Sequence, residues 1–136
     1  MRFWAFLSVF TVFGTVLIDF KDAHADHLNC RQLHEAAFLD EPGEVRDALA
    51  HGIDVNCKDA LGHTALVTAV NGASIESFNV LMKAGAKVNV LTEFGQSLLK
   101  HTEKKFRSVD HQKGLEQYRD LYEIMIARLQ TAGATN

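Results

Sequence analysis

Cysteine and histidine side chains are the groups in this chain best suited to metal or thiol chemistry. There are two cysteines, Cys30 and Cys57, and seven histidines. None of the histidines has the spacing of a metal centre, and the chain contains no H-E-x-x-H, C-x-x-C, G-x-S-x-G or phosphate-binding glycine loop. The set comprises His24, His27, His34, His51, His63, His101 and His111. We therefore predict a protein with no catalytic residues, no metal and no cofactor.

The segments that position these side chains repeat with a period of 33 residues. The recurring residues are Leu33, Leu66 and Leu99; Ala36 and Ala69; Gly52 and Gly85; Val55 and Val88; Asn56 and Asn89; and Gly62 and Gly95. A period of this length is typical of stacked repeat proteins, in which each unit needs its neighbours to bury its apolar face.

The recurring residues resemble the ankyrin family. Residues 33–37 (LHEAA) and 62–69 (GHTALVTA) are similar to the family signature G-x-T-P-L-H-x-A. Residues 49–56 (LAHGIDVN) and 81–89 (LMKAGAKVN) are similar to its closing L-L-x-x-G-A-D-V-N. Ala65, Val67 and Lys87 depart from the family preference for Pro, His and Asp. The resemblance implies an all-α ankyrin-repeat solenoid with two full repeats and an enlarged C-terminal capping repeat. It also implies that His34 bonds loop backbone.

The first 25 residues have the pattern of a secretory signal peptide. Arg2 precedes an apolar run from Phe3 to Ile18, and residues 23–25 (AHA) form an A-x-A cleavage site. An uncleaved anchor is the alternative, although the apolar run is shorter than the roughly 20 residues that a membrane span needs. We expect cleavage after Ala25, a periplasmic location, no membrane association after cleavage and one domain over residues 26–136. The repeats are expected at about 31–59, 60–92 and 93–134.

Helix boundaries within the repeats follow from local residue preferences. Repeat 1 is expected to have one helix over about 31–38, with Asn29 as a possible cap, and a second that begins at Pro42. In repeat 2 we expect Thr64 and Ser74 to cap the two helices and Gly72 to end the first.

The third repeat contains fifteen extra residues, because its closing Gly133 follows Gly85 by 48 residues. We assign the insertion to the polar segment 102–114, as a surface loop that either binds a partner or is simply mobile. A final helix after Gly114 is expected to pack Tyr118 and other apolar residues inward; the full set is Leu115, Tyr118, Leu121, Tyr122, Met125 and Leu129.

Charge is distributed unevenly along the chain. The formal net charge is −3, whereas residues 100–113 carry five basic and two acidic side chains. A basic segment on an acidic body favours an acidic protein partner over nucleic acid, which usually requires a basic domain.

The ankyrin frame also implies a disulfide. It places Cys30 and Cys57 at the bases of neighbouring fingers, the loops that project from the solenoid, and an exported chain meets an oxidising compartment. Two free buried thiols are the alternative.

Ankyrin proteins bind partners through finger tips and the concave helix face, so the resemblance implies a set of partner-binding residues. They are Lys58, Asp59, Ala60 and Leu61 on the second finger, Thr92, Glu93 and Phe94 on the third, and Lys104, Lys105, Phe106 and Arg107 in the insertion. For Phe94 the alternative is packing against the neighbouring finger.

Two functional classes compete. Small exported bacterial ankyrin proteins, including self-protection proteins that restrain peptidoglycan endopeptidases, are similar in layout. The resemblance therefore implies a monomeric immunity protein that inhibits a peptidoglycan hydrolase by covering its active site. The alternatives are a periplasmic accessory scaffold, for example in oxidative-stress defence, and a secreted effector that acts in a host.

Overall fold

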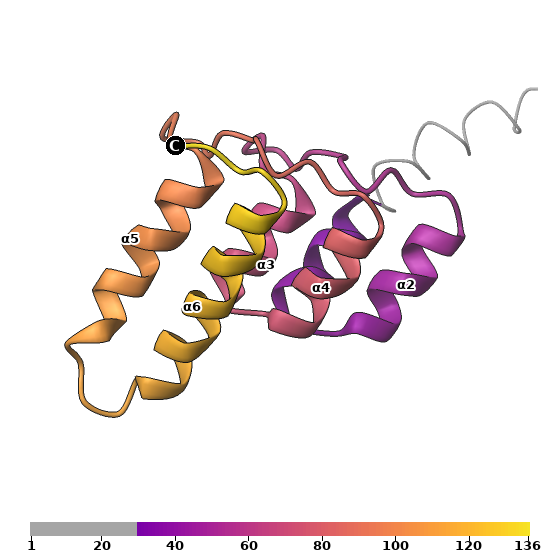
Figure 1. Ribbon diagram of the computed structural model, residues 1–136. Coiled ribbons are helices and arrows are strands. Elements are labelled where there is room, and N and C mark those ends of the chain that lie inside the picture. Colours follow the sequence, from indigo (N-terminus) through magenta and orange to yellow (C-terminus); the bar gives the residue numbers. More distant parts are fainter. Residues whose placement is uncertain (1–29) are drawn as a thin grey trace, which may run out of the picture.

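The computed structural model describes residues 30–136, and these residues form a helical solenoid (Figure 1). Residues 30–38 are helical and are followed by α2 (Pro42–Ala50), α3 (Ala65–Gly72), α4 (Ile75–Lys83), α5 (Leu98–Asp110) and α6 (Glu116–Thr131). The predicted signal peptide and Asn29 lie outside the described residues. Within the described part, extended pairing is limited to two isolated bridges, Lys58 to Thr64 and Leu91 to Ser97. No helix of that part is long and apolar enough to cross a membrane.

The helices form two layers, as expected for an ankyrin-repeat solenoid. Helices α2, α4 and α6 lie side by side in one layer, with α2 contacting α4 and α4 contacting α6 (Figure 1). Segment 30–38, α3 and α5 form the other layer, and each is paired with the second helix of its own repeat. The predicted all-α fold, with two repeats and an enlarged third, is thus what the structure shows.

The 33-residue period places equivalent side chains in one continuous core. Leu33, Leu66 and Leu99 are all buried, as are Ala36 and Ala69 one turn further along. The burial of each leucine against its neighbouring repeats contributes about 1.5–3 kcal/mol. Of the residues predicted to face inward in the last helix, Tyr122, Met125 and Leu129 are buried, while the prediction for Tyr118 is wrong because its side chain is exposed.

Asparagines connect the end of each repeat to the next. The Asn56 side-chain oxygen accepts a hydrogen bond of 2.8 Å from the Lys87 amide. One repeat later, the Asn89 oxygen accepts from the Thr135 amide at 2.9 Å, and its amide group donates to the Gly133 carbonyl at 3.2 Å. The segment after α6 therefore contacts Asn89 in the same way as the loop after α4 contacts Asn56.

The two predicted N-cap residues in repeat 2 act differently from the expectation. Helix α2 begins at Pro42 as predicted. Thr64 and Ser74 occupy the N-cap positions of α3 and α4, but neither side chain makes the capping hydrogen bond. The Ser74 hydroxyl instead donates to the Phe38 carbonyl at 2.7 Å, because the end of the first helix lies close to the start of α4. Gly72 is the last residue of α3 as predicted, with Ala73 following it in the left-handed conformation.

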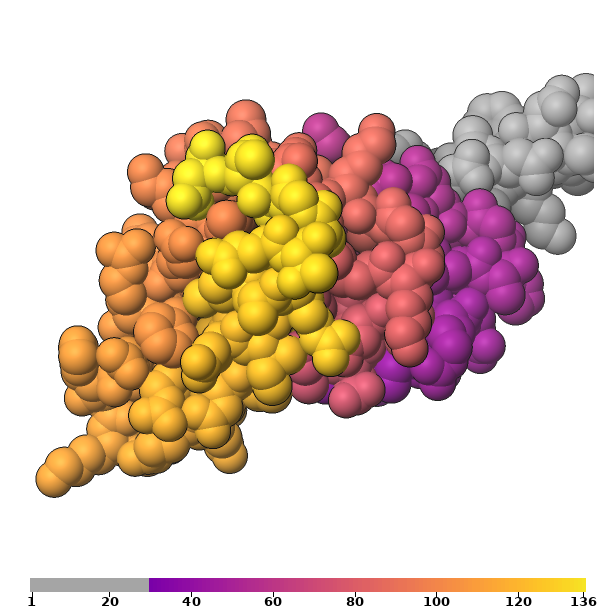
Figure 2. Space-filling model, in the orientation of Figure 1, coloured from indigo at the N-terminus to yellow at the C-terminus, as the bar shows by residue number. Residues whose placement is uncertain are grey.

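The prediction of a loop over residues 102–114 is wrong. Residues 102–110 belong to α5, and only 111–115 connect α5 to α6. The inserted residues lengthen both helices, so that the α5–α6 hairpin extends beyond the edge of the neighbouring repeat, at lower left in Figures 1 and 2.

Candidate partner-binding surface

The second finger is a short hairpin held by the carboxylate of Asp59. The Asp59 amide donates to the His63 carbonyl at 3.0 Å, next to the bridge between Lys58 and Thr64. One carboxylate oxygen of Asp59 accepts from the amides of Leu61 and His63, both at 2.9 Å. A left-handed Gly62 (φ 81°) closes the turn. These bonds fix the tip of the loop against the helix that follows it.

The third finger has the same backbone pattern without the carboxylate. The Thr92 amide donates to the Gln96 carbonyl and the Gly95 amide to the Thr92 carbonyl, both at 2.9 Å. Thr92 occupies the position of Asp59, but its buried hydroxyl has no hydrogen-bond partner. This finger therefore depends more on its neighbour for its position.

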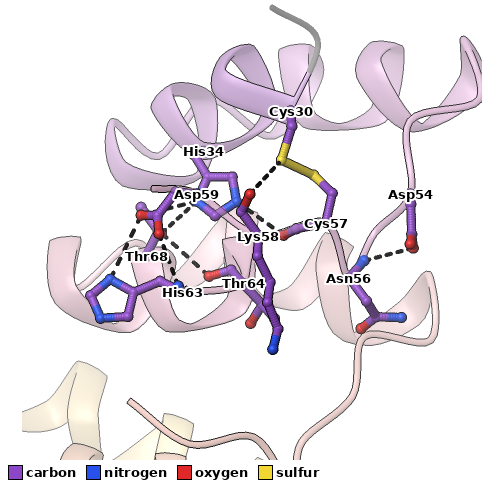
Figure 3. Close-up of a disulfide and its surroundings, with 10 residues drawn as sticks. All are labelled: Cys30, His34, Asp54, Asn56, Cys57, Lys58, Asp59, His63, Thr64 and Thr68. Atoms are coloured by element: carbon purple, nitrogen blue, oxygen red, sulfur yellow. Dashed lines mark hydrogen bonds and ion pairs between the residues drawn. A yellow bond between two sulfur atoms is a disulfide. The ribbon is translucent and has the colours of Figure 1, made fainter. Parts of the chain in front are cut away.

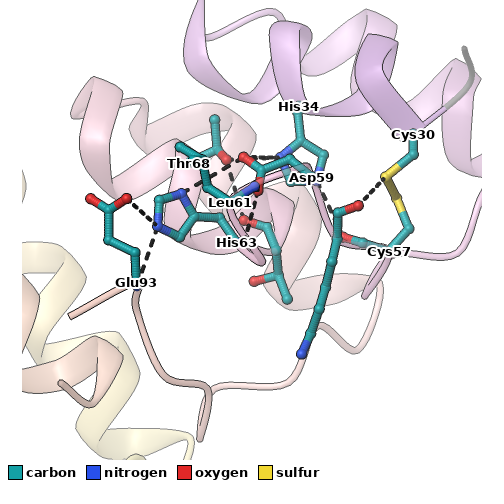
Figure 4. Close-up of polar contacts among 10 residues, drawn as sticks. Cys30, His34, Cys57, Asp59, Leu61, His63, Thr68 and Glu93 are labelled. Atoms are coloured by element: carbon teal, nitrogen blue, oxygen red, sulfur yellow. Dashed lines mark hydrogen bonds and ion pairs between the residues drawn. A yellow bond between two sulfur atoms is a disulfide. The ribbon is translucent and has the colours of Figure 1, made fainter. Parts of the chain in front are cut away.

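The side chain of His63 connects the two fingers (Figure 4). Its Nδ1 lies 3.7 Å from an Asp59 carboxylate oxygen, and its Nε2 accepts from the Glu93 amide at 3.4 Å. A Glu93 carboxylate oxygen lies 3.9 Å from the same Nε2. The buried imidazole thus lies between the two fingers, and the hydrogen bond from the Glu93 amide joins it to the third finger.

His34 makes the loop contacts that the family resemblance implies. Its Nε2 lies 3.2 Å from the Cys57 carbonyl oxygen and its Nδ1 lies 2.9 Å from the Thr68 hydroxyl. Burial lowers the pKa of His34, against the opposing effects of the Cys57 carbonyl and the nearby Asp59 carboxylate. The neutral imidazole is thus favoured, and it ties the first helix to the second finger.

Large apolar side chains are exposed on both fingers. The exposed fractions are 63% for Leu61, 64% for Leu91 and 72% for Phe94. Leu61 and Phe94 occupy equivalent positions in successive repeats, so they form adjacent parts of one edge. Phe94 does not fold back to become buried against the neighbouring finger. Leu91 was not among the predicted partner-binding residues, although it is an apolar residue at the position that Lys58 occupies one repeat earlier.

The predicted finger residues differ in how accessible they are. Lys58, Ala60 and Glu93 are exposed and Asp59 is half-buried. Thr92 is only 6% exposed, so its side chain supports the finger and is not on its surface. The two fingers therefore supply an apolar edge with charged neighbours.

The predicted insertion residues lie on α5, away from the finger tips. Lys104 and Arg107 are exposed and follow Lys100 at helical spacing, forming a basic stripe along α5 that we define by these three residues. Arg107 lies 3.6 Å from the Glu103 carboxylate. Lys105 is half-buried.

Phe106 is not the exposed aromatic that a surface loop would present. It is half-buried and packs against the core, together with Val109. Its position on the inward side of α5 leaves the basic stripe as the only part of the predicted insertion site that is fully open to water.

Cys30 and Cys57 are joined by a disulfide, with 6.1 Å between their Cα atoms (Figure 3). The bond connects the first helix to the loop that begins the second finger. His34 lies beside it, and the two sulfur atoms and an imidazole nitrogen all lie within 4.8 Å of one another. No sequence motif grouped these three residues. The spacing of Cys30 and His34 by four positions on one helix was the available indication, since it places both on the same face.

Comparison with known proteins supports the repeat assignment. No family model matches the chain. It is 35% identical over 86 residues to the BTB/POZ domain and ankyrin repeat-containing protein NPR1 of Malus hupehensis, a match that covers 62% of this chain and 15% of that protein. The chain thus spans a small part of the length of this relative.

Proposed function

We propose that this protein is a protein-binding module whose partner contacts the edge formed by the two fingers. The observation that carries the proposal is the exposure of Leu61, Leu91 and Phe94 on loops fixed by backbone hydrogen bonds and by His63. Residues on rigid loops lose little conformational entropy on binding, and an aromatic anchor such as Phe94 surrounded by apolar contacts is the kind of residue that contributes most to affinity. The similarity to an ankyrin repeat-containing protein supports this class of function.

Exposed Lys58 and the basic stripe on α5 favour a partner with acidic groups beside its apolar site. Lys58 is exposed on the second finger, and the basic stripe of Lys100, Lys104 and Arg107 begins just after the third. Charged groups at the rim of an interface mainly accelerate association and exclude wrongly charged partners, while the apolar centre supplies most of the affinity.

At a finer level, we propose an exported self-protection protein that inhibits a peptidoglycan-cleaving endopeptidase in the periplasm. The expected signal peptide and the resemblance to small exported ankyrin proteins support this role. Inhibition by occlusion requires only a rigid surface that covers a substrate groove. A stable complex usually buries about 1,200–2,000 Å², an area for which the two fingers and part of α5 are suitable contributors.

The test combines purified protein with candidate endopeptidases and follows cleavage of peptidoglycan cross-links. We expect equimolar protein to suppress cleavage and to co-elute with the enzyme on size exclusion. Phe94→Ala should weaken binding by about 2 kcal/mol, or roughly 30-fold. Phe38→Ala is the matched control, because Phe38 is also an exposed aromatic but lies at the far end of the first helix.

A second variant distinguishes a charged residue at the rim of the interface from the apolar residues at its centre. Lys104→Ala should lower the association rate and its salt dependence with little effect on dissociation. Equal losses for Phe38→Ala and Phe94→Ala would contradict the finger-edge proposal. Undiminished cleavage by every endopeptidase would contradict the inhibitor role, and a multi-protein set in a pull-down would then favour an accessory scaffold.

A further inference from the structure

The disulfide lies in a polar corner of the fold that also contains an imidazole. Cys30 and His34 are separated by one turn of the first helix, and Cys57 approaches from the loop after α2 (Figure 3). Their sulfur and nitrogen atoms lie within 4.8 Å of one another. Two cysteines and one histidine are a common ligand set for zinc.

We propose that reduction of the disulfide converts this corner into a binding site for Zn²⁺, with Cys30, Cys57 and His34 as the protein ligands. The reductant is a dithiol, which transfers two electrons and two protons to the disulfide and itself becomes a disulfide. Zn²⁺ then displaces the two thiol protons and bonds both thiolates. The covalent link and the metal are thus alternative ways to join the first helix to the second finger.

The distances suit tetrahedral coordination. Zinc bonds thiolates at about 2.3 Å and imidazole nitrogen at about 2.0 Å, so the ligand atoms of a tetrahedral site are separated by about 3.6–3.8 Å. The three atoms already lie within 4.8 Å, so shifts of about 1 Å are sufficient. The two Cα atoms are 6.1 Å apart. Once the disulfide is broken, rotation about the Cα–Cβ bonds of the cysteines is therefore enough to bring the sulfur atoms to this spacing.

The surroundings of His34 resemble those of a metal-bound histidine. Its Nε2 faces the loop of Cys57, whose carbonyl oxygen it would exchange for the metal. Its Nδ1 lies 2.9 Å from the Thr68 hydroxyl, and that hydroxyl is 3.3 Å from the Thr64 carbonyl, to which it donates. A hydroxyl that donates elsewhere has lone pairs left to accept an Nδ1 proton.

A carboxylate also lies near the His34 imidazole. An Asp59 oxygen lies 3.9 Å from the His34 Nδ1 (Figure 4). Hydroxyl or carboxylate partners of this kind orient a histidine ligand and increase its basicity. Cys30 and Cys57 are both half-buried, so water has access to the group, and with three protein ligands it resembles open zinc centres more than closed structural ones.

The test titrates the full chain with Co²⁺ under anaerobic conditions, after reduction and removal of the reductant. Reduced protein is expected to bind one Co²⁺ with thiolate charge-transfer absorption and the visible bands of tetrahedral cobalt, which Zn²⁺ then abolishes by displacement. The disulfide-bonded protein should show neither. Cys57→Ser should weaken binding by more than about 100-fold, and Thr68→Val by about 10–100-fold with the absorption bands retained.

His111→Ala is the matched control, because this exposed histidine lies at the far end of the α5–α6 hairpin and should not affect the titration. Circular dichroism of each sample reports whether reduction alone unfolds the chain; Zn²⁺ should then restore helicity. Binding by the disulfide-bonded form with equal affinity, absence of thiolate absorption, or a reduced chain that stays unfolded with Zn²⁺ would overturn the proposal.

Discussion

Gly72 marks the point where two repeats approach too closely for any side chain. A Cβ atom at this position would lie 2.4 Å from the Phe38 carbonyl oxygen and 2.6 Å from the Ser74 hydroxyl oxygen. These two oxygens form the 2.7 Å hydrogen bond that connects repeat 1 to repeat 2. Substitution of Gly72 by alanine therefore requires the end of the first helix or the start of α4 to move.

The size of the effect follows from two opposing contributions. Loss of a hydrogen bond that leaves a buried group unpaired costs about 1–3 kcal/mol. Alanine in place of glycine in a helix is favourable by about 0.5–1 kcal/mol. We expect Gly72→Ala to lower the free energy of unfolding by about 1–2 kcal/mol, equivalent to a decrease in Tm of about 5–15 °C for a domain of this size.

Gly43→Ala supplies the matched control. Gly43 lies in the first turn of α2, where an added Cβ meets nothing within 4 Å. The same chemical change should therefore increase the free energy of unfolding by about 0.5 kcal/mol. Urea denaturation of both variants measures the two effects, and they should have opposite signs. A Gly72→Ala variant as stable as the unmodified protein would refute the reasoning.

Other predictions concern the disulfide and pH. Replacement of Cys30 and Cys57 together by serine should lower the free energy of unfolding by about 3.5 kcal/mol, since the bond closes a loop with a sequence separation of 27, and thermal denaturation without metal measures this loss. Burial lowers the pKa of both His34 and His101, and for His101 the Lys105 charge adds to the effect. At mildly acidic pH the unfolded chain therefore binds more protons than the folded chain. The stabilisation that depends on neutral His34 and His101 is fully present above about pH 6.5. Below that pH the free energy of unfolding should decrease by at most about 1.4 kcal/mol per pH unit for each group. His34→Gln should reduce this slope in urea denaturation curves measured between pH 7.5 and 5; an unchanged slope would show that His34 does not contribute.

The repeat period was sufficient to predict the two layers and the fingers. Leu33, Leu66 and Leu99 are buried as their shared position requires, and the glycines at 62 and 95 close equivalent turns. Such features depend on local sequence and on contacts between neighbouring repeats. They recur wherever the pattern recurs, so the sequence alone identifies them.

The length of α5 was not predicted because one of its core positions is polar. Thr102 lies 33 residues after Ala69, yet it interrupts the apolar pattern between Leu99 and Phe106. In the structure its hydroxyl donates to the Leu98 carbonyl at 2.8 Å, so the side chain is satisfied within its own helix and is fully buried. Phe106 and Val109 then continue the inward face. The polar composition of residues 102–114 therefore led to the wrong prediction of a loop.

Some contacts between distant segments were not predicted, although the ankyrin resemblance implied the Cys30–Cys57 disulfide and the loop contact of His34. The hydroxyl of Ser74 bonds a carbonyl 36 residues away, in place of capping its own helix. The grouping of Cys30, His34 and Cys57 likewise depends on how the first helix meets the second finger. These arrangements follow from the angle and spacing of packed helices, which no single repeat motif encodes.

The long hairpin of α5 and α6 bears on how such a protein can gain repeats by duplication. A copied 33-residue unit inserted between the first and second repeats would meet neighbours of its own length and the same asparagine bonds. A unit placed after α6 would instead pack against a helix whose exposed side chains include the charged residues Glu123 and Arg128. We therefore expect an added repeat to be accommodated more readily between the first two repeats than directly after α6.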